Sequence, residues 1–214
     1  MLRLNPLRLA FTATLFAGSL SAQAQTSAPL YPKLSKTLDS LAAVDQRPMQ
    51  QMMQGPQPDS VMKRLVAEQP LNFARHQPIL EAIVKKYGYP GFRQVGEKSS
   101  NNFWLLVQHA DAYPLFQRQV LKLMLVEVQR KNASPRNYAY LTDRIAENSG
   151  QLQEYGTQVK YEGPGIGKAA PRSLRDPKNV NKRRAAIGME TLEDYLKTSD
   201  ALHEQMNVAK PKNF

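Results

Sequence analysis

The stretch FWLLVQHAD, residues 103–111, is apolar on nearly every side when it is wound as a helix. A helix of that kind lies in a protein core, because it has no broad polar face to turn toward water. The polar residues 99–102 precede it and are suited to begin the helix. The sequence therefore predicts a buried helix that begins near residue 99.

Other segments carry apolar residues on one face at helical spacing, and this pattern predicts amphipathic helices. These stripes lie at residues 34–44, 61–66, 79–87, 115–128, 138–145 and 192–202. Since such stripes recur along the chain from residue 34 to residue 202, the fold is expected to be mainly α.

Capping residues and prolines indicate where several of these helices begin and end. Ser134 precedes Pro135, which is the order of an N-cap followed by proline in the first helical position, and Thr191 can cap the last helix. A helix that begins near Asp59 is expected to end before Pro70, because proline lacks an amide donor and disfavours helix in the preceding residue.

The segment 151–175 breaks the helical pattern, because glycines and prolines interrupt every run within it. We expect an extended or looped segment here, with a short strand pair near residues 155–161. The predicted fold is mainly α: a single compact multi-helix domain with one irregular or short-strand segment near 151–175.

The N-terminus, MLRLNPLRLAFTATLFAGSLSAQAQ, has the order of a secretory signal peptide. Two arginines precede an apolar stretch at residues 9–20, and the small-x-small sequence AQA follows at 22–24. About 12 apolar residues are too few to cross a bilayer, which needs roughly 20. We therefore expect a signal peptide at 1–24, a leader with one helix at 25–58, and a helical domain at 59–214. The mature protein is expected to be exported, to the periplasm or the extracellular space.

The composition argues against several kinds of chemistry. The chain has no cysteine and only three histidines, so thiol chemistry is excluded and neither a metal site nor a cofactor is expected. The net charge is +11, and residues 160–184 hold eight basic residues against two acidic ones. For an exported protein this predicts an anionic envelope component as partner, and no nucleic acid. A solvated surface is the alternative interpretation of the same charges.

His109 is the strongest candidate for catalysis, because it lies among apolar residues of the predicted buried helix. It would act as a general base oriented by a carboxylate, and Asp111 is the nearest carboxylate in the sequence. The alternative is a structural histidine that joins helices through its two ring nitrogens, since buried polar groups must be hydrogen-bonded.

Polar residues of three other motifs could line a ligand site together with His109. The candidate ligand-binding residues are Gln108, Asp143, Arg144, Tyr155, Thr157, Gln158 and Arg183. Arg144 could clamp a carboxylate or phosphate, although a solvated helix face explains residues 143–144 equally well. We expect His109, Asp111, Arg144, Tyr155 and Gln158 to converge on one partly accessible cavity.

Five motifs occur in one order along the chain: YGYPGFRQVG, FWLLVQHAD, NYAYLTDRI, QEYGTQ and DPKNVNKRRAAIGMETLEDYL. In this order and spacing, over residues 45–196, the chain resembles a bacterial family that is defined only as a domain of unknown function. The resemblance implies a helical domain, found in exported and non-exported proteins, and carries no activity. One departure is Tyr89, where family members often have tryptophan before the proline.

Two functions remain open at this point. The first is an exported protein that binds an anionic envelope component through a polar pocket or the basic segment 160–184. The alternative is a hydrolase-type acid–base enzyme centred on His109.

Overall fold

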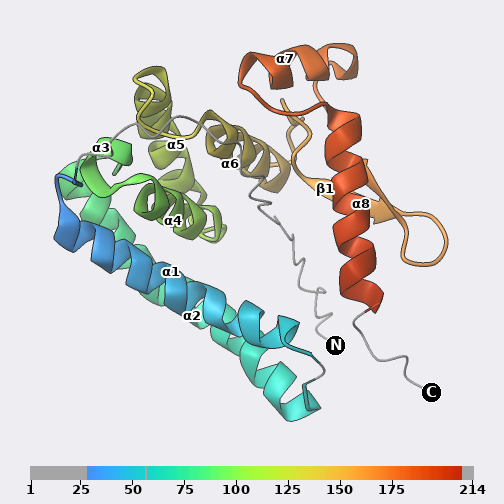
Figure 1. Cartoon of the computed structure of the whole chain (residues 1–214), viewed down its shortest axis with the longest axis horizontal. Coiled ribbons are helices and arrows are strands. Elements are labelled where there is room, and N and C mark those ends of the chain that lie inside the picture. Colours follow the sequence, from blue (N-terminus) through green and yellow to red (C-terminus); the bar gives the residue numbers. More distant parts are fainter. Residues whose placement is uncertain (1–27, 56, 209–214) are drawn as a thin grey trace.

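The structure is a computed structural model that describes residues 28–55 and 57–208 (Figure 1). The predicted signal peptide at 1–24 lies outside the described residues. Within the described part the fold is mainly helical, with eight α-helices and one two-stranded antiparallel hairpin. This confirms the predicted fold class.

The elements follow one another in a simple order along the chain. They are α1 (Pro32–Met53), α2 (Asp59–Tyr87), α3 (Phe92–Val95), α4 (Glu97–Gln108), α5 (Pro114–Gln129), α6 (Pro135–Asn148), β1 (Val159–Glu162), β2 (Lys168–Pro171), a short 3-10 helix (Pro177–Asn179), α7 (Val180–Ala186) and α8 (Leu192–Val208).

Helix α4 is the centre of the core, as its apolar sequence predicts. Phe103, Leu106 and Val107 are almost wholly inaccessible, and α4 contacts α1, α2, α3, α5 and α6. Its polar first turn is used as well, because Ser99 and Asn102 each donate a hydrogen bond of 2.8 Å to Asp39 of α1. Helix α1 is thereby fastened to the core helix.

Helices α1 and α2 lie side by side along one edge of the molecule, away from α7 and α8 (Figure 1). The expectation that α2 ends before Pro70 is wrong, because the helix continues through Pro70 and Pro78 to Tyr87. Both prolines face solvent, while Leu65 and Leu80 on the opposite side are buried. Burial of that side outweighs the amide hydrogen bonds that the prolines cannot make.

The predicted N-caps of α6 and α8 are confirmed. Ser134 Oγ accepts a hydrogen bond from the Asn137 amide, and Thr191 Oγ1 accepts one from the Asp194 amide, both at 3.2 Å. These bonds satisfy amide groups in the first turns of α6 and α8 that have no partner within the helix.

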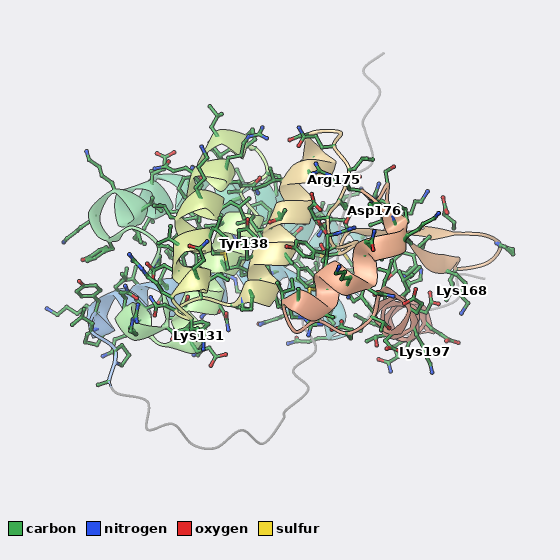
Figure 2. The ribbon with its side chains drawn as sticks, turned by 90° about the horizontal axis from the view of Figure 1, so that it is seen from above. Lys131, Tyr138, Lys168, Arg175, Asp176 and Lys197 are labelled. Atoms are coloured by element: carbon green, nitrogen blue, oxygen red, sulfur yellow. The ribbon has the colours of Figure 1, made fainter. Side chains whose placement is uncertain are left out.

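The strand pair in the segment 151–175 is a hairpin, β1–β2, that packs against α8. It lies later in the chain than the predicted residues 155–161, because residues 163–167 form the turn between its strands. Asp200 of α8 accepts a hydrogen bond of 2.6 Å from the Ala169 amide, and His203 stacks on Tyr161 with ring centroids 3.6 Å apart. Lys168 of the hairpin and Lys197 of α8 lie at one end of the molecule, and Tyr138 lies between them and Lys131 in this view (Figure 2).

No helix in the described part of the chain combines the length and the apolar character needed to cross a membrane.

Candidate acid–base site

The carboxylate that orients His109 is Asp45, which comes from α1, 64 residues earlier in the chain. The Nδ1 atom of His109 lies 2.7 Å from Asp45 Oδ2. An ionised carboxylate can only accept, so in a neutral imidazole this contact puts the proton on Nδ1 and the lone pair on Nε2. His109 is placed at the C-terminal cap of α4, directly after the buried part of that helix.

The two partners differ in their access to solvent. The side chain of Asp45 is 1% exposed, whereas that of His109 is 21% exposed. Gln46 donates a second hydrogen bond of 2.7 Å to the same carboxylate oxygen, Oδ2. A buried, doubly hydrogen-bonded carboxylate therefore holds an imidazole that remains open to solvent on part of its surface.

A second histidine completes the group on the side of α2. His76 is buried, and its Nδ1 lies 3.9 Å from the other oxygen of Asp45, Oδ1. Burial lowers the pKa of His76 below its ordinary value, the Asp45 carboxylate opposes that change, and His109 adds to it. His76 is therefore a neutral imidazole at pH 7.

The face of α2 that meets this group is polar at several buried positions. Gln69, Asn72 and His76 are all buried there, and the Phe73 ring lies 5.1 Å from the ring of His109. Sequence reasoning missed His76 and Asp45. A signal for His76 was present, because Gln69, Asn72 and His76 follow helical spacing between the buried Leu65 and Leu80.

Asp111 lies close to His109 in sequence but is hydrogen-bonded elsewhere. Its carboxylate accepts two hydrogen bonds from Arg144, at 2.8 and 2.6 Å, one from Asn148 at 2.9 Å and one from Gln117 at 3.2 Å. This forked pair joins the loop after α4 to α6. Arg144 is thus engaged with a carboxylate of the protein itself.

Asp143 occupies the centre of a different group. It is fully buried and accepts hydrogen bonds from the amides of Glu154, Tyr155 and Thr157, and from the Thr157 hydroxyl. Burial raises the pKa of the Asp143 carboxyl, and these hydrogen bonds oppose that rise. The interpretation of residue 143 as part of a solvated helix face is therefore wrong.

Two arginines of α7 hold the same loop, residues 154–157, through its carbonyl groups. Arg183 Nε donates to the Glu154 carbonyl and Arg184 Nη1 to the Tyr155 carbonyl, both at 2.7 Å. Arg184 is fully buried, and its guanidinium also lies 5.0 Å from the centre of the Tyr195 ring. The loop is thus bound from one side through its amides and from the other through its carbonyls.

Gly156 and Gln158 complete this arrangement. Gly156 has φ +71°, and a Cβ atom there would lie 3.0 Å from Leu174 and 3.1 Å from Leu192, so both conformation and space favour glycine. The amide of Gln158 donates to the Gln153 side chain at 2.8 Å, while the Gln153 side chain donates to the Gln158 carbonyl at 2.9 Å. These contacts give the YGTQ motif a structural explanation.

The hydrogen bonds thus divide the predicted site residues into three groups. His109 bonds to Asp45, Arg144 bonds to Asp111, and Tyr155 and Thr157 bond to Asp143. Gln108 is buried in α4, and its backbone carbonyl accepts a hydrogen bond of 3.3 Å from Gln117. A functional role for each of these residues stays a prediction.

The basic segment 160–184 is largely neutralised by acidic residues of the protein. Six of its eight basic residues form ion pairs, namely Lys160, Lys168, Arg172, Arg175, Arg183 and Arg184. Only Lys178 and Lys182 of this segment have no ion-pair partner among residues 28–55 and 57–208. Within the same residues, no three histidine or acidic side chains are arranged to hold a metal ion.

Comparison with known proteins gives the family. The family model of DUF6624, a family of unknown function, matches residues 32–206. The chain belongs to this family. The match runs from the first residue of α1 nearly to the end of α8, so the DUF6624 domain includes Asp45, His76 and His109. The resemblance to a domain of unknown function is thereby confirmed. Neither a curated protein nor a solved structure matches the chain.

Proposed function

We propose that this DUF6624 protein is exported and that its functional site is the Asp45–His109 pair, where His109 acts as a general acid–base in a hydrolase-type reaction. The observation that carries the proposal is the hydrogen bond of 2.7 Å between a buried carboxylate and a partly exposed imidazole. This is the geometry in which a carboxylate fixes the ring orientation and the tautomer of a catalytic histidine.

Each group has a defined part in this chemistry. Asp45 keeps the proton of neutral His109 on Nδ1, so Nε2 takes a proton from water or a hydroxyl group of the ligand. The positive imidazolium that results is stabilised by Asp45, and the proton then passes to the leaving group. His76 stays neutral, so it adds no second positive charge beside the first.

The tautomer of His109 provides the first test. In ¹⁵N spectra of the histidine-labelled protein at neutral pH, we expect the Nδ1-protonated form of His109, and we expect Asp45→Asn to reduce that preference. An Nε2-protonated His109 in the wild-type protein would contradict the assigned role, because no lone pair would then be available at Nε2.

Turnover provides the second test. The wild-type protein, His109→Gln and Asp45→Asn are compared on p-nitrophenyl esters, phosphates and glycosides, with His203→Gln as a control outside the site. General acid–base catalysis contributes about 10² to 10⁴ in rate, so both site variants should lose at least 100-fold while the control retains activity. Equal rates in wild type and His109→Gln, or no turnover of any probe, would end the hydrolase proposal.

The second candidate is binding of an anionic envelope component, favoured by a net charge of +11 for the whole chain, or +9 once Arg3 and Arg8 are removed with residues 1–24. Because most of the segment 160–184 is internally paired, its cations are poorly suited to bind such a partner. Export itself, on which both candidates depend, is tested by the intact mass of protein from the periplasmic or secreted fraction. We expect a chain that begins at Gln25, and retention of residues 1–24 would contradict export.

A further inference from the structure

The outward face of α2 is the largest concentration of unpaired positive charge on a single described helix. Its exposed basic residues are Lys63, Arg64, Arg75, Lys85 and Lys86. None of the five forms an ion pair with a residue in the described part of the chain. Their spacing places them on one side of the helix over about 35 Å, because each helical residue advances about 1.5 Å.

The same face is apolar between its charges. Leu71 is 55% exposed and Ile79 is 40% exposed, and the three alanines and two prolines between residues 67 and 82 are exposed as well. Glu81 is the one exposed acidic residue between Lys63 and Lys86. The opposite side of α2 packs against α1 and α4, so this face is directed outward at the edge of the molecule (Figure 1).

An anionic bilayer surface offers partners for both kinds of side chain on this face. The cations contact anionic headgroups, and the apolar side chains enter the boundary between headgroups and acyl chains. A soluble polyanion would use the cations alone and would leave Leu71 and Ile79 in water.

We propose that the outward face of α2, from Lys63 to Lys86, docks on an anionic lipid bilayer surface. This surface would be the partner in the second candidate function, and the proposal rests on the export of the protein. It is independent of the acid–base chemistry, because the face lies on the side of α2 opposite His76.

Vesicle binding by the purified full chain tests the proposal. Partitioning is measured by co-sedimentation with vesicles of phosphatidylcholine alone and of phosphatidylcholine with 30% phosphatidylglycerol, at low and high salt. We expect binding that requires phosphatidylglycerol and weakens as salt rises. Residues 1–24 are the same in wild type and in every variant, so their contribution to partitioning is common to all the proteins compared.

Two double charge reversals distinguish the contribution of this face to vesicle binding from the contribution of the net charge. Lys63→Glu/Arg75→Glu alters the face, and Lys122→Glu/Lys197→Glu makes the same change in net charge on exposed residues of α5 and α8. The first variant should partition at least tenfold more weakly, and the second should stay within about twofold of wild type. Equal losses in the two variants would overturn the proposal.

Replacement of the exposed apolar residues distinguishes a site for a lipid surface from a site for a soluble polyanion. Leu71→Gln/Ile79→Gln keeps every charge and should weaken partitioning at least threefold. Absence of phosphatidylglycerol-dependent binding, or full binding by this variant, would overturn the proposal. His109→Gln should bind vesicles as wild type does, so the outcomes for α2 and for the acid–base site are read separately.

Discussion

Replacement of Asp143 by alanine removes the carboxylate that four donors share at one buried point. The amides of Glu154, Tyr155 and Thr157 point at this carboxylate, and so does the Thr157 hydroxyl. The hydroxyl can rotate toward another acceptor, but the three amides are fixed by the backbone. Asp143→Ala therefore leaves three amides without a partner, that of Thr157 in a buried contact and those of Glu154 and Tyr155 in partly buried contacts.

The magnitude follows from the burial of those donors. One buried donor without a partner costs about 1 to 3 kcal/mol, and removal of one partner from a buried charged contact costs about 3 to 5 kcal/mol. We expect the free energy of unfolding to fall by about 3 to 5 kcal/mol, since local relaxation lets water reach some of the amides. For a domain of this size, 1 kcal/mol corresponds to about 2 to 4 °C, so the melting temperature should fall by about 6 to 20 °C.

Thermal unfolding followed by far-UV circular dichroism measures the change, with urea unfolding for the free energy. The control is Glu162→Ala, which also removes a carboxylate but from a pair that is about half exposed. That variant should remain within about 1 kcal/mol of wild type, because exposed ion pairs contribute little. If the melting temperature of Asp143→Ala equals that of the control, the carboxylate does not hold the 154–157 loop and our explanation of the YGTQ motif is wrong.

Three further outcomes are expected. Gly156→Ala should destabilise the protein by about 1 kcal/mol more than Gly150→Ala in urea unfolding. Both glycines have positive φ, but only at Gly156 would a Cβ atom meet leucine side chains within 4 Å. Equal losses would mean that backbone strain alone explains the effect. Arg184→Lys should lower the free energy of unfolding by about 2 to 4 kcal/mol in the same assay, since an ammonium group cannot reach both the Tyr155 and the Glu190 carbonyls as the guanidinium of Arg184 does. An unchanged free energy would show that these hydrogen bonds contribute nothing. His76 has a pKa below its ordinary 6.5, so the folded state takes up fewer protons than the unfolded state and stability falls as pH drops below about 6.5. His76→Gln should therefore make the unfolding midpoints measured between pH 7 and 5 depend less on pH. An unchanged dependence would contradict the burial of a neutral imidazole.

Local sequence patterns determined the longer helices of this protein, with one exception. The apolar run of α4 led to its place in the core, and Ser134 and Thr191 marked two helix starts, because caps and helical periodicity act over three or four residues. Pro70 was the exception. Local propensity there favoured an end to the helix, and the buried side of α2 outweighed it.

The site depended on contacts that no local pattern contains. Sequence reasoning singled out His109 and the need for a carboxylate beside it, but the nearest carboxylate in sequence, Asp111, is bound by Arg144. The partner is Asp45, which the packing of α1 on α4 brings to within 2.7 Å across 64 residues of chain. Residue types and helical faces follow from the sequence alone. The pairing of polar side chains from different helices is decided only when those helices pack, because hydrogen bonds act over about 3 Å and do not depend on the distance along the chain.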